Sequence, residues 1–99
     1  MPKLISRRKF TDTLNKLGNY EVKLSKKTTP LGFKCYSGFI LSLDTGKCAY
    51  LDAESAFNPH CGYKVLVRSA REMYDYSGGM NNFVSSENSP YFVHNLLRQ

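Results

Sequence analysis

Apolar and polar residues alternate most regularly in the middle of the chain, in two runs separated by a short turn. Residues 33–43 and 47–53 are rich in aromatic and aliphatic side chains, and Asp44-Thr45-Gly46 lies between them. Two such runs joined by a short turn that contains glycine are typical of a β-hairpin. The pattern therefore predicts a hairpin over residues 33–53, with Gly46 in the left-handed conformation.

A three-residue turn would also set the register of this hairpin. It places Leu41 opposite Ala49 and Phe39 opposite Leu51, so these four side chains would share one face. We expect that face to be buried, because a slip of one residue would set Phe39 and Leu41 against polar neighbours. The other, outer face would then carry Tyr36, Ile40, Ser42, Cys48 and Tyr50.

The N-terminal region predicts a helix followed by a strand. Residues 5–18 carry one apolar stripe with Phe10, Leu14 and Leu17 at helical spacing, after a possible Ser6 cap and before Gly18. Residues 19–26 instead alternate strictly between apolar and polar, which is typical of a half-buried strand. Residues 26–32 contain a proline and a glycine and predict a loop.

The C-terminal half predicts one further strand and two helices. Residues 54–62 read as a connection, and residues 63–68 as a strand with Tyr63, Val65 and Val67 on one face. Ser69 and Glu72 have the spacing of a capping box, which predicts a short helix to about residue 76.

After that short helix, residues 80–88 indicate a loop or a weak edge strand. Ser89-Pro90 predicts the start of a last helix, because proline is favoured at the first helical position. A strand over residues 91–93 is the alternative.

These elements predict one α+β domain that spans residues 1–99. We expect an antiparallel sheet of three to four strands, with an N-terminal helix and one or two C-terminal helices packed on one face. A chain of this length can bury one modest core.

Charge is distributed unevenly along the chain. Residues 1–34 carry nine basic and two acidic side chains, a net charge of +7, whereas residues 35–99 carry five basic and six acidic ones. Such an asymmetry favours a polyanionic partner. We therefore expect a small, non-enzymatic module that binds nucleic acid or a nucleoprotein complex, with phosphate contacts that give affinity but little sequence readout.

The residues expected to form this nucleic-acid surface are basic side chains of the first third and two tyrosines of the hairpin. The tyrosine rings would stack on unpaired bases. The predicted contacts are Arg7, Arg8, Lys9, Lys23, Lys26, Lys27, Lys34, Tyr36 and Tyr50.

Two other functions fit the same residues. The first is a protein–protein inhibitor or adaptor of the kind found in phages and mobile elements, or a homodimer, with Tyr36, Ile40 and Tyr50 at the interface. The second is a small metal-independent ribonuclease, in which basic, tyrosine and histidine side chains position phosphate and transfer protons. Its candidate residues are Arg68, Arg71, Tyr74, Tyr76, His94 and Arg98.

The cysteine and histidine positions favour no metal site and no cofactor. Cys35, Cys48 and Cys61 include no close pair, and the adjacent His60 does not readily converge with Cys61 on one ion. An odd number of cysteines favours a reducing, cytoplasmic setting. No apolar run is long enough for a membrane span or follows the basic N-terminus as in a signal peptide.

Overall fold

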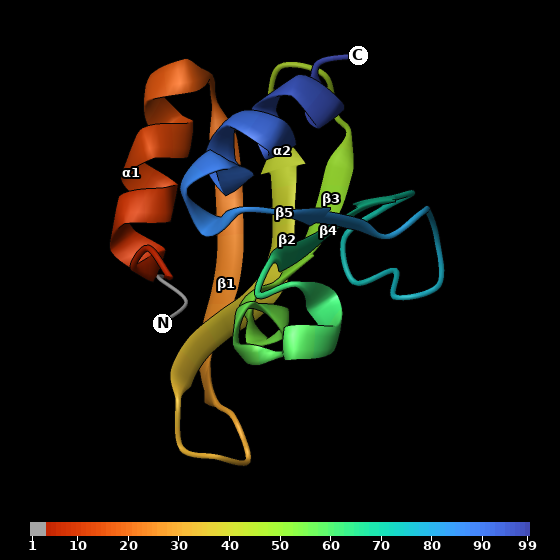
Figure 1. Cartoon of the computed structure of the whole chain (residues 1–99). Helices are drawn as coiled ribbons and strands as arrows, with labels where there is room; N and C mark the ends of the chain where they lie inside the picture. Colours follow the sequence, from red (N-terminus) through yellow and green to blue (C-terminus); the bar gives the residue numbers. More distant parts are fainter. Residues whose placement is uncertain (1–3) are drawn as a thin grey trace.

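A computed structural model describes residues 4–99 as a five-stranded antiparallel sheet with both α-helices on one face (Figure 1). The strands follow one another in the sheet in their order along the chain. The α-helices are α1 (Arg7–Leu17) and α2 (Ser89–Leu97). The strands are β1 (Tyr20–Thr28), β2 (Lys34–Ser42), β3 (Cys48–Asp52), β4 (Val65–Ala70) and β5 (Asn82–Val84). Short 3-10 helices are η1 (Ala53–Phe57), η2 (Pro59–Cys61) and η3 (Ser86–Asn88).

The α+β class and the position of the helices confirm the prediction, but the expected number of strands was too low. The additional strand is β5, in which Val84 pairs with Val65 and Asn82 pairs with Val67. It lies in the segment that the sequence left open between a loop and a weak edge strand, and it forms one edge of the sheet. Strand β1 forms the other edge.

Both predicted terminal helices form, for the local reasons that the sequence indicates. The Ser6 hydroxyl accepts a hydrogen bond of 3.0 Å from the Lys9 amide, and α1 ends at Gly18. Helix α2 begins at Ser89-Pro90, which excludes the alternative strand over residues 91–93. The two helices pack against each other although they come from opposite ends of the chain.

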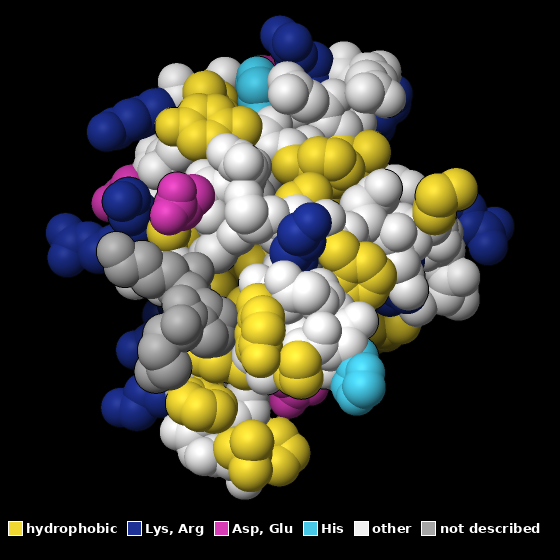
Figure 2. Space-filling view, in the orientation of Figure 1, with side chains coloured by type: hydrophobic (Ala, Val, Ile, Leu, Met, Phe, Trp, Pro, Cys, Tyr) yellow, Lys and Arg dark blue, Asp and Glu magenta, His cyan; other side chains and the backbone are white. Residues whose placement is uncertain are grey.

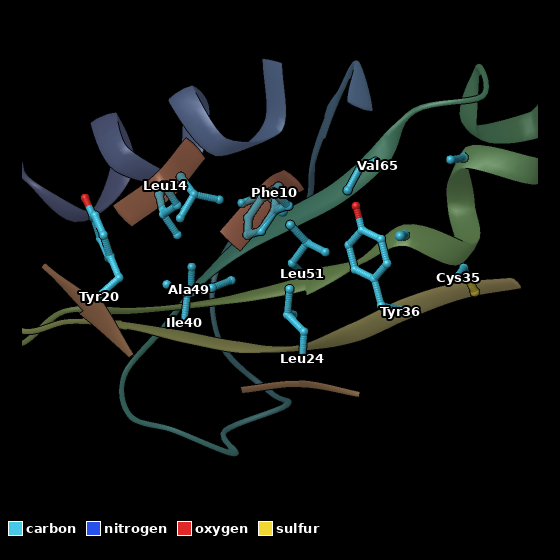
Figure 3. Close-up of a cluster of buried hydrophobic side chains, with 14 of the residues drawn as sticks. Phe10, Leu14, Tyr20, Leu24, Cys35, Tyr36, Ile40, Ala49, Leu51 and Val65 are labelled. Carbon is cyan, nitrogen blue, oxygen red and sulfur yellow. The ribbon is translucent and has the colours of Figure 1, made fainter. Parts of the chain in front are cut away.

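The core lies between these helices and the inner face of the sheet (Figure 3). Phe10 and Leu14 of α1 are fully buried, as are Ile40 of β2 and Leu51 of β3. Tyr36 also points inward, and its ring lies 6.3 Å from that of Phe10. Burial of these apolar groups is the main stabilising term for such a domain.

The central hairpin and its left-handed Gly46 confirm the prediction, but the predicted register is wrong by one residue. Phe39 pairs with Tyr50 and Ile40 pairs with Ala49. The reason is the loop: it has four residues, 43–46, closed by a hydrogen bond of 2.9 Å from the Ser42 amide to the Lys47 carbonyl. Leu43 is therefore exposed, and Ile40 replaces Leu41 at the core.

The predicted helix over residues 69–76 is wrong. Strand β4 continues to Ala70, and Ser69 pairs with Ala49 of β3, so its backbone belongs to the sheet and cannot cap a helix. Residues 71–81 form an irregular segment instead. Tyr63, expected in the same strand, precedes β4 in a left-handed conformation and is half exposed.

Candidate functional site

Four basic side chains from the first third of the chain line one groove of about 540 Å³. The groove lies between the start of α1, the C-terminal end of β1 and the N-terminal end of β2. We call it the basic groove; its basic residues are Arg7, Lys26, Lys27 and Lys34, and no carboxylate lines it among the described residues, although the Lys27 ammonium lies within 4.0 Å of two carboxylates outside it. In the space-filling view, Lys and Arg side chains gather along the left edge of the molecule, over α1 and β1 (Figure 2).

Strand pairing and one hydrogen bond place these cations. Lys26 lies opposite Tyr36 and Lys34 lies opposite Thr28 in the β1–β2 pair. Arg7 Nη1 donates a hydrogen bond of 2.8 Å to the carbonyl oxygen of Leu24, which fixes its guanidinium at the edge of the sheet. Unpaired backbone groups on an edge strand otherwise attract other strands, so Arg7 also protects this edge.

Lys27 differs from the other lysines of the groove because it already has acidic partners. Its Nζ lies 3.1 Å from Asp52 Oδ1 and 3.9 Å from Glu54 Oε2. Partial burial lowers the pKa of Lys27, but the hydrogen bond and charge of Asp52 outweigh this effect and raise it above its ordinary value. Lys26 and Lys34 are exposed, and no carboxylate among residues 4–99 lies within 4.0 Å of either ammonium group.

The remaining predicted cations lie outside the basic groove. Arg8 faces Asp12 one turn along α1, with Nε 3.8 Å from Oδ2. Lys9 lines a separate hollow that also contains Glu87. Lys23 lies 3.3 Å from Glu21. Lys3, counted among the early basic residues, lies outside the described residues.

Tyr36 and Tyr50 do not share a face, because the register differs from the predicted one. Tyr36 is 3% exposed, and its hydroxyl donates a hydrogen bond of 2.8 Å to the Ile5 carbonyl. Burial raises the pKa of Tyr36 far above its ordinary value. Tyr36 and Ile40 are thus core residues, unavailable in this fold for base stacking or for a protein interface. Tyr50 lies on the opposite, outer face of the sheet, beside Phe39.

That outer face carries a cluster of four aromatic rings that we call the tyrosine face: Phe39, Tyr50, Tyr74 and Tyr76. Phe39 is buried beneath the other three, with ring centres 5.2, 5.4 and 5.1 Å from its own. Tyr74 and Tyr76 are 64% and 63% exposed. The rings line a hollow of about 430 Å³, together with Lys23 and residues of β1 and β2.

The segment 71–81 holds these tyrosines through Asp75. Its carboxylate accepts hydrogen bonds from the Ser77 hydroxyl at 2.7 Å and the Ser77 amide at 3.0 Å. These hydrogen bonds lower the pKa of Asp75. The tyrosine face is not predicted by the sequence, which places Tyr74 and Tyr76 among the candidate ribonuclease residues, because a helix over residues 69–76 would point their side chains in different directions. The sequence feature that could have indicated the face is that the two tyrosines lie on either side of Asp75, just before Gly78-Gly79.

Arg68 completes the outer face. Its guanidinium carbon lies 4.8 Å from the centre of the Tyr50 ring, a cation–π contact. Its Nε is buried and has no hydrogen-bond partner among the described residues. The cation–π contact compensates in part for this unmet donor.

The residues proposed for a ribonuclease are divided between the two faces of the sheet. His94 lies on α2, where its Nδ1 forms a short hydrogen bond with the Tyr20 hydroxyl. Tyr74 and Tyr76 lie beyond the sheet, against Phe39. Within residues 4–99 the histidine therefore does not meet the tyrosines, and no three His, Cys, Asp or Glu side chains are grouped so as to hold a metal ion.

The described part of the chain contains no helix of the length and apolarity needed to cross a bilayer. No protein-family model matches the sequence, no curated protein matches it, and no solved structure matches the fold.

Proposed function

We propose that this protein is a small, non-enzymatic module that binds the phosphate backbone of nucleic acid through the basic groove. The observation that carries the proposal is the convergence of Arg7, Lys26 and Lys34 on one groove that no carboxylate of residues 4–99 lines; Lys27 also lines this groove, but its ammonium group is paired with Asp52. Release of counterions from the nucleic acid would supply most of the affinity.

The four cations would contribute differently. Lys26 and Lys34 are exposed and without acidic partners within the described residues, so binding phosphate costs them no existing ion pair. Arg7 keeps its hydrogen bond to Leu24 and offers its remaining N–H groups as donors. Lys27 adds positive potential that Asp52 reduces.

The salt dependence of binding tests the proposal. Fluorescence anisotropy with a labelled oligodeoxythymidine should give a log–log slope of about −3 to −4 between about 50 and 200 mM salt, for roughly four to six phosphate contacts on a single strand. A slope near zero, or no binding at the lower salt concentration, would contradict the proposal.

A pair of matched variants separates the groove from net charge. The double variant Lys26→Glu, Lys34→Glu should lower affinity by about tenfold or more and make the slope shallower by about 1.4, because two phosphate contacts to a single strand are lost. The control is Lys47→Glu, Lys64→Glu, which changes the charge equally at two exposed lysines outside the groove. Equal losses in both variants would assign binding to overall charge and not to the groove.

The two other functions have weaker support in the geometry. A protein inhibitor or adaptor would use the tyrosine face, since Tyr36 and Ile40 are buried. A ribonuclease would need His94 and the tyrosines at one phosphate, although they lie on opposite faces of the sheet.

A further inference from the structure

Three hollows follow one another around the edge strand β1. The basic groove shares Arg7 with a hollow of about 360 Å³ between α1 and β1. That second hollow shares Val22 and Leu24 with the hollow of the tyrosine face. A flexible chain that lies in the basic groove can therefore pass Arg7, cross the β1 edge beside the Arg8–Asp12 ion pair that lines the second hollow, and reach the tyrosines.

The tyrosine face has the geometry of a surface that receives a flat ring. Its ring pairs meet at interplanar angles of 54° to 76°, so no two rings cover each other face to face. Phe33 and Phe57 contrast with them: they are stacked at 4.7 Å with an angle of 4°, and each covers one face of the other. Tyr74 and Tyr76 keep ring surface for a partner.

The lining of this hollow contains Lys23 and no carboxylate among the described residues. Two carboxylates contact its lining residues from outside: Glu21 lies 3.3 Å from the Lys23 ammonium, and Asp52 accepts a hydrogen bond of 3.4 Å from the Tyr50 hydroxyl. Asp75, which lies between the two exposed tyrosines, turns its carboxylate toward Ser77 and Arg71. A base bound here would therefore rest on the rings, and Lys23 would add little net charge for its phosphate because Glu21 is its partner.

We infer that the tyrosine face is a base-stacking subsite, so that the nucleic acid bound by this protein is single-stranded. The inference rests on the proposed function, because the basic groove holds the phosphates of the same strand. Bases in a duplex are already stacked on one another, whereas unpaired bases stack on aromatic side chains. The subsite is independent of base identity, since every base has a flat face.

The left-handed backbone of Tyr74, with φ of 67°, decides which substitution is informative. Asparagine tolerates that conformation, so Tyr74→Asn removes the ring with little backbone strain. We combine it with Tyr76→Ser. The matched control is Tyr63→Asn, because Tyr63 is also half exposed and has φ of 57° but lines none of the three hollows. Tyr74→Phe, Tyr76→Phe keeps both rings.

Three probes of equal length separate base from backbone: an oligodeoxythymidine, an abasic sugar-phosphate oligomer and a DNA duplex. The oligodeoxythymidine should bind most tightly. The Tyr74→Asn, Tyr76→Ser variant should lose about 10- to 100-fold of that affinity, with an unchanged salt slope. The phenylalanine variant and Tyr63→Asn should bind as the wild type does.

The outcomes distinguish failure of the base-stacking subsite from failure of the proposed function. Equal binding of the abasic oligomer and the oligodeoxythymidine would overturn the base subsite and leave the basic groove standing. Tighter binding of the duplex than of the oligodeoxythymidine would likewise overturn the base subsite but not the basic groove. Absence of binding to all three probes would overturn both proposals. If the wild type dimerises in sedimentation and the tyrosine variant does not, with unchanged oligonucleotide affinity, the face is a protein interface and the inference is wrong.

Discussion

Gly38 of β2 lies so close to the carbonyl group of Lys23 on β1 that a Cβ atom has no room between them. A Cβ on Gly38 would overlap the Lys23 carbonyl oxygen and lie 3.1 Å from the Cα of Leu24, and the φ of Gly38 is +154°. Only glycine allows this approach, and it holds β1 against β2 beside the tyrosine face.

We therefore expect Gly38→Ala to destabilise the fold by about 3 kcal/mol or more, because backbone atoms must move apart. Urea unfolding followed by circular dichroism measures the effect. Gly46→Ala is the control: Gly46 is also left-handed but has open space around it, so the cost should be near 1 kcal/mol. Equal losses would show that φ, and not the close approach, requires glycine at residue 38.

The buried hydroxyl of Tyr36 predicts a loss of stability at alkaline pH. Burial raises its pKa above the ordinary 10.0, so the folded state keeps the proton that the unfolded state releases. The stabilisation is complete below pH 10.0 and decreases as the pH rises toward the folded-state pKa.

Tyr36→Phe should cost about 1 kcal/mol at neutral pH, through the lost hydrogen bond to Ile5, but flatten the decline above pH 10.0. Denaturant titrations at about pH 8 and pH 11 test this. Tyr91→Phe, at a half-exposed ring, should follow the wild type. If the stability of Tyr36→Phe declines above pH 10.0 as steeply as that of the wild type, the alkaline loss of stability does not come from Tyr36.

The ion pair of Lys27 and Asp52 should stabilise the fold more than a fully exposed pair does. The two side chains are 33% and 20% exposed, against 91% and 64% for Arg8 and Asp12. A double-mutant cycle with Lys27→Met and Asp52→Asn should give a coupling of about 1 kcal/mol. The corresponding cycle for Arg8 and Asp12 should give less than about 0.5 kcal/mol. A larger coupling energy for Arg8 and Asp12 than for Lys27 and Asp52 would mean that burial does not determine the strength of these ion pairs.

Asp75 should control the order of segment 71–81. Asp75→Asn weakens its hydrogen bonds to Ser77, so the Ser77 amide should exchange with solvent about fivefold faster or more. Because the pKa of Asp75 is lowered in the fold, its contribution is present above the unfolded value of 3.8 and is lost as the pH falls through the lower folded value. Hydrogen exchange by NMR measures the effect of the substitution and the effect of low pH on the Ser77 amide. An unchanged exchange rate at Ser77 in Asp75→Asn would contradict the role of Asp75.

The elements that sequence reasoning located correctly are those with local causes. The Ser6 cap and the Phe10–Leu14 stripe are complete within α1, and Ser89-Pro90 marks α2 without any distant partner. The hairpin register is not local. Thr45 of its loop donates a hydrogen bond of 2.6 Å to the Leu97 carbonyl, and Asp44 accepts one of 3.0 Å from Asn19. Contacts with distant residues thus stabilise a four-residue loop where the turn residues favoured three.

The candidate site was predictable in composition but not in geometry. The excess of basic residues before residue 35 is plain in the sequence, yet which of them converge depends on the pairing of β1 with β2. That pairing brings Lys26 and Lys34 into the basic groove, whereas Lys9 on α1 lines a different hollow together with Glu87. The tyrosine face was not predictable, because Ser69 and Glu72 satisfy a helix pattern locally while β3 binds the same backbone.

The packing of α1 against α2 has a consequence for synthesis in the cell. Phe10 and Leu14 emerge early from the ribosome, but Val93 and Leu97, which complete the same core, are made about eighty residues later. The first helix of the nascent chain therefore lacks one of its packing partners until α2 leaves the exit tunnel. Translation pauses shortly before residue 89 would therefore prolong exposure of that helix to chaperones and proteases.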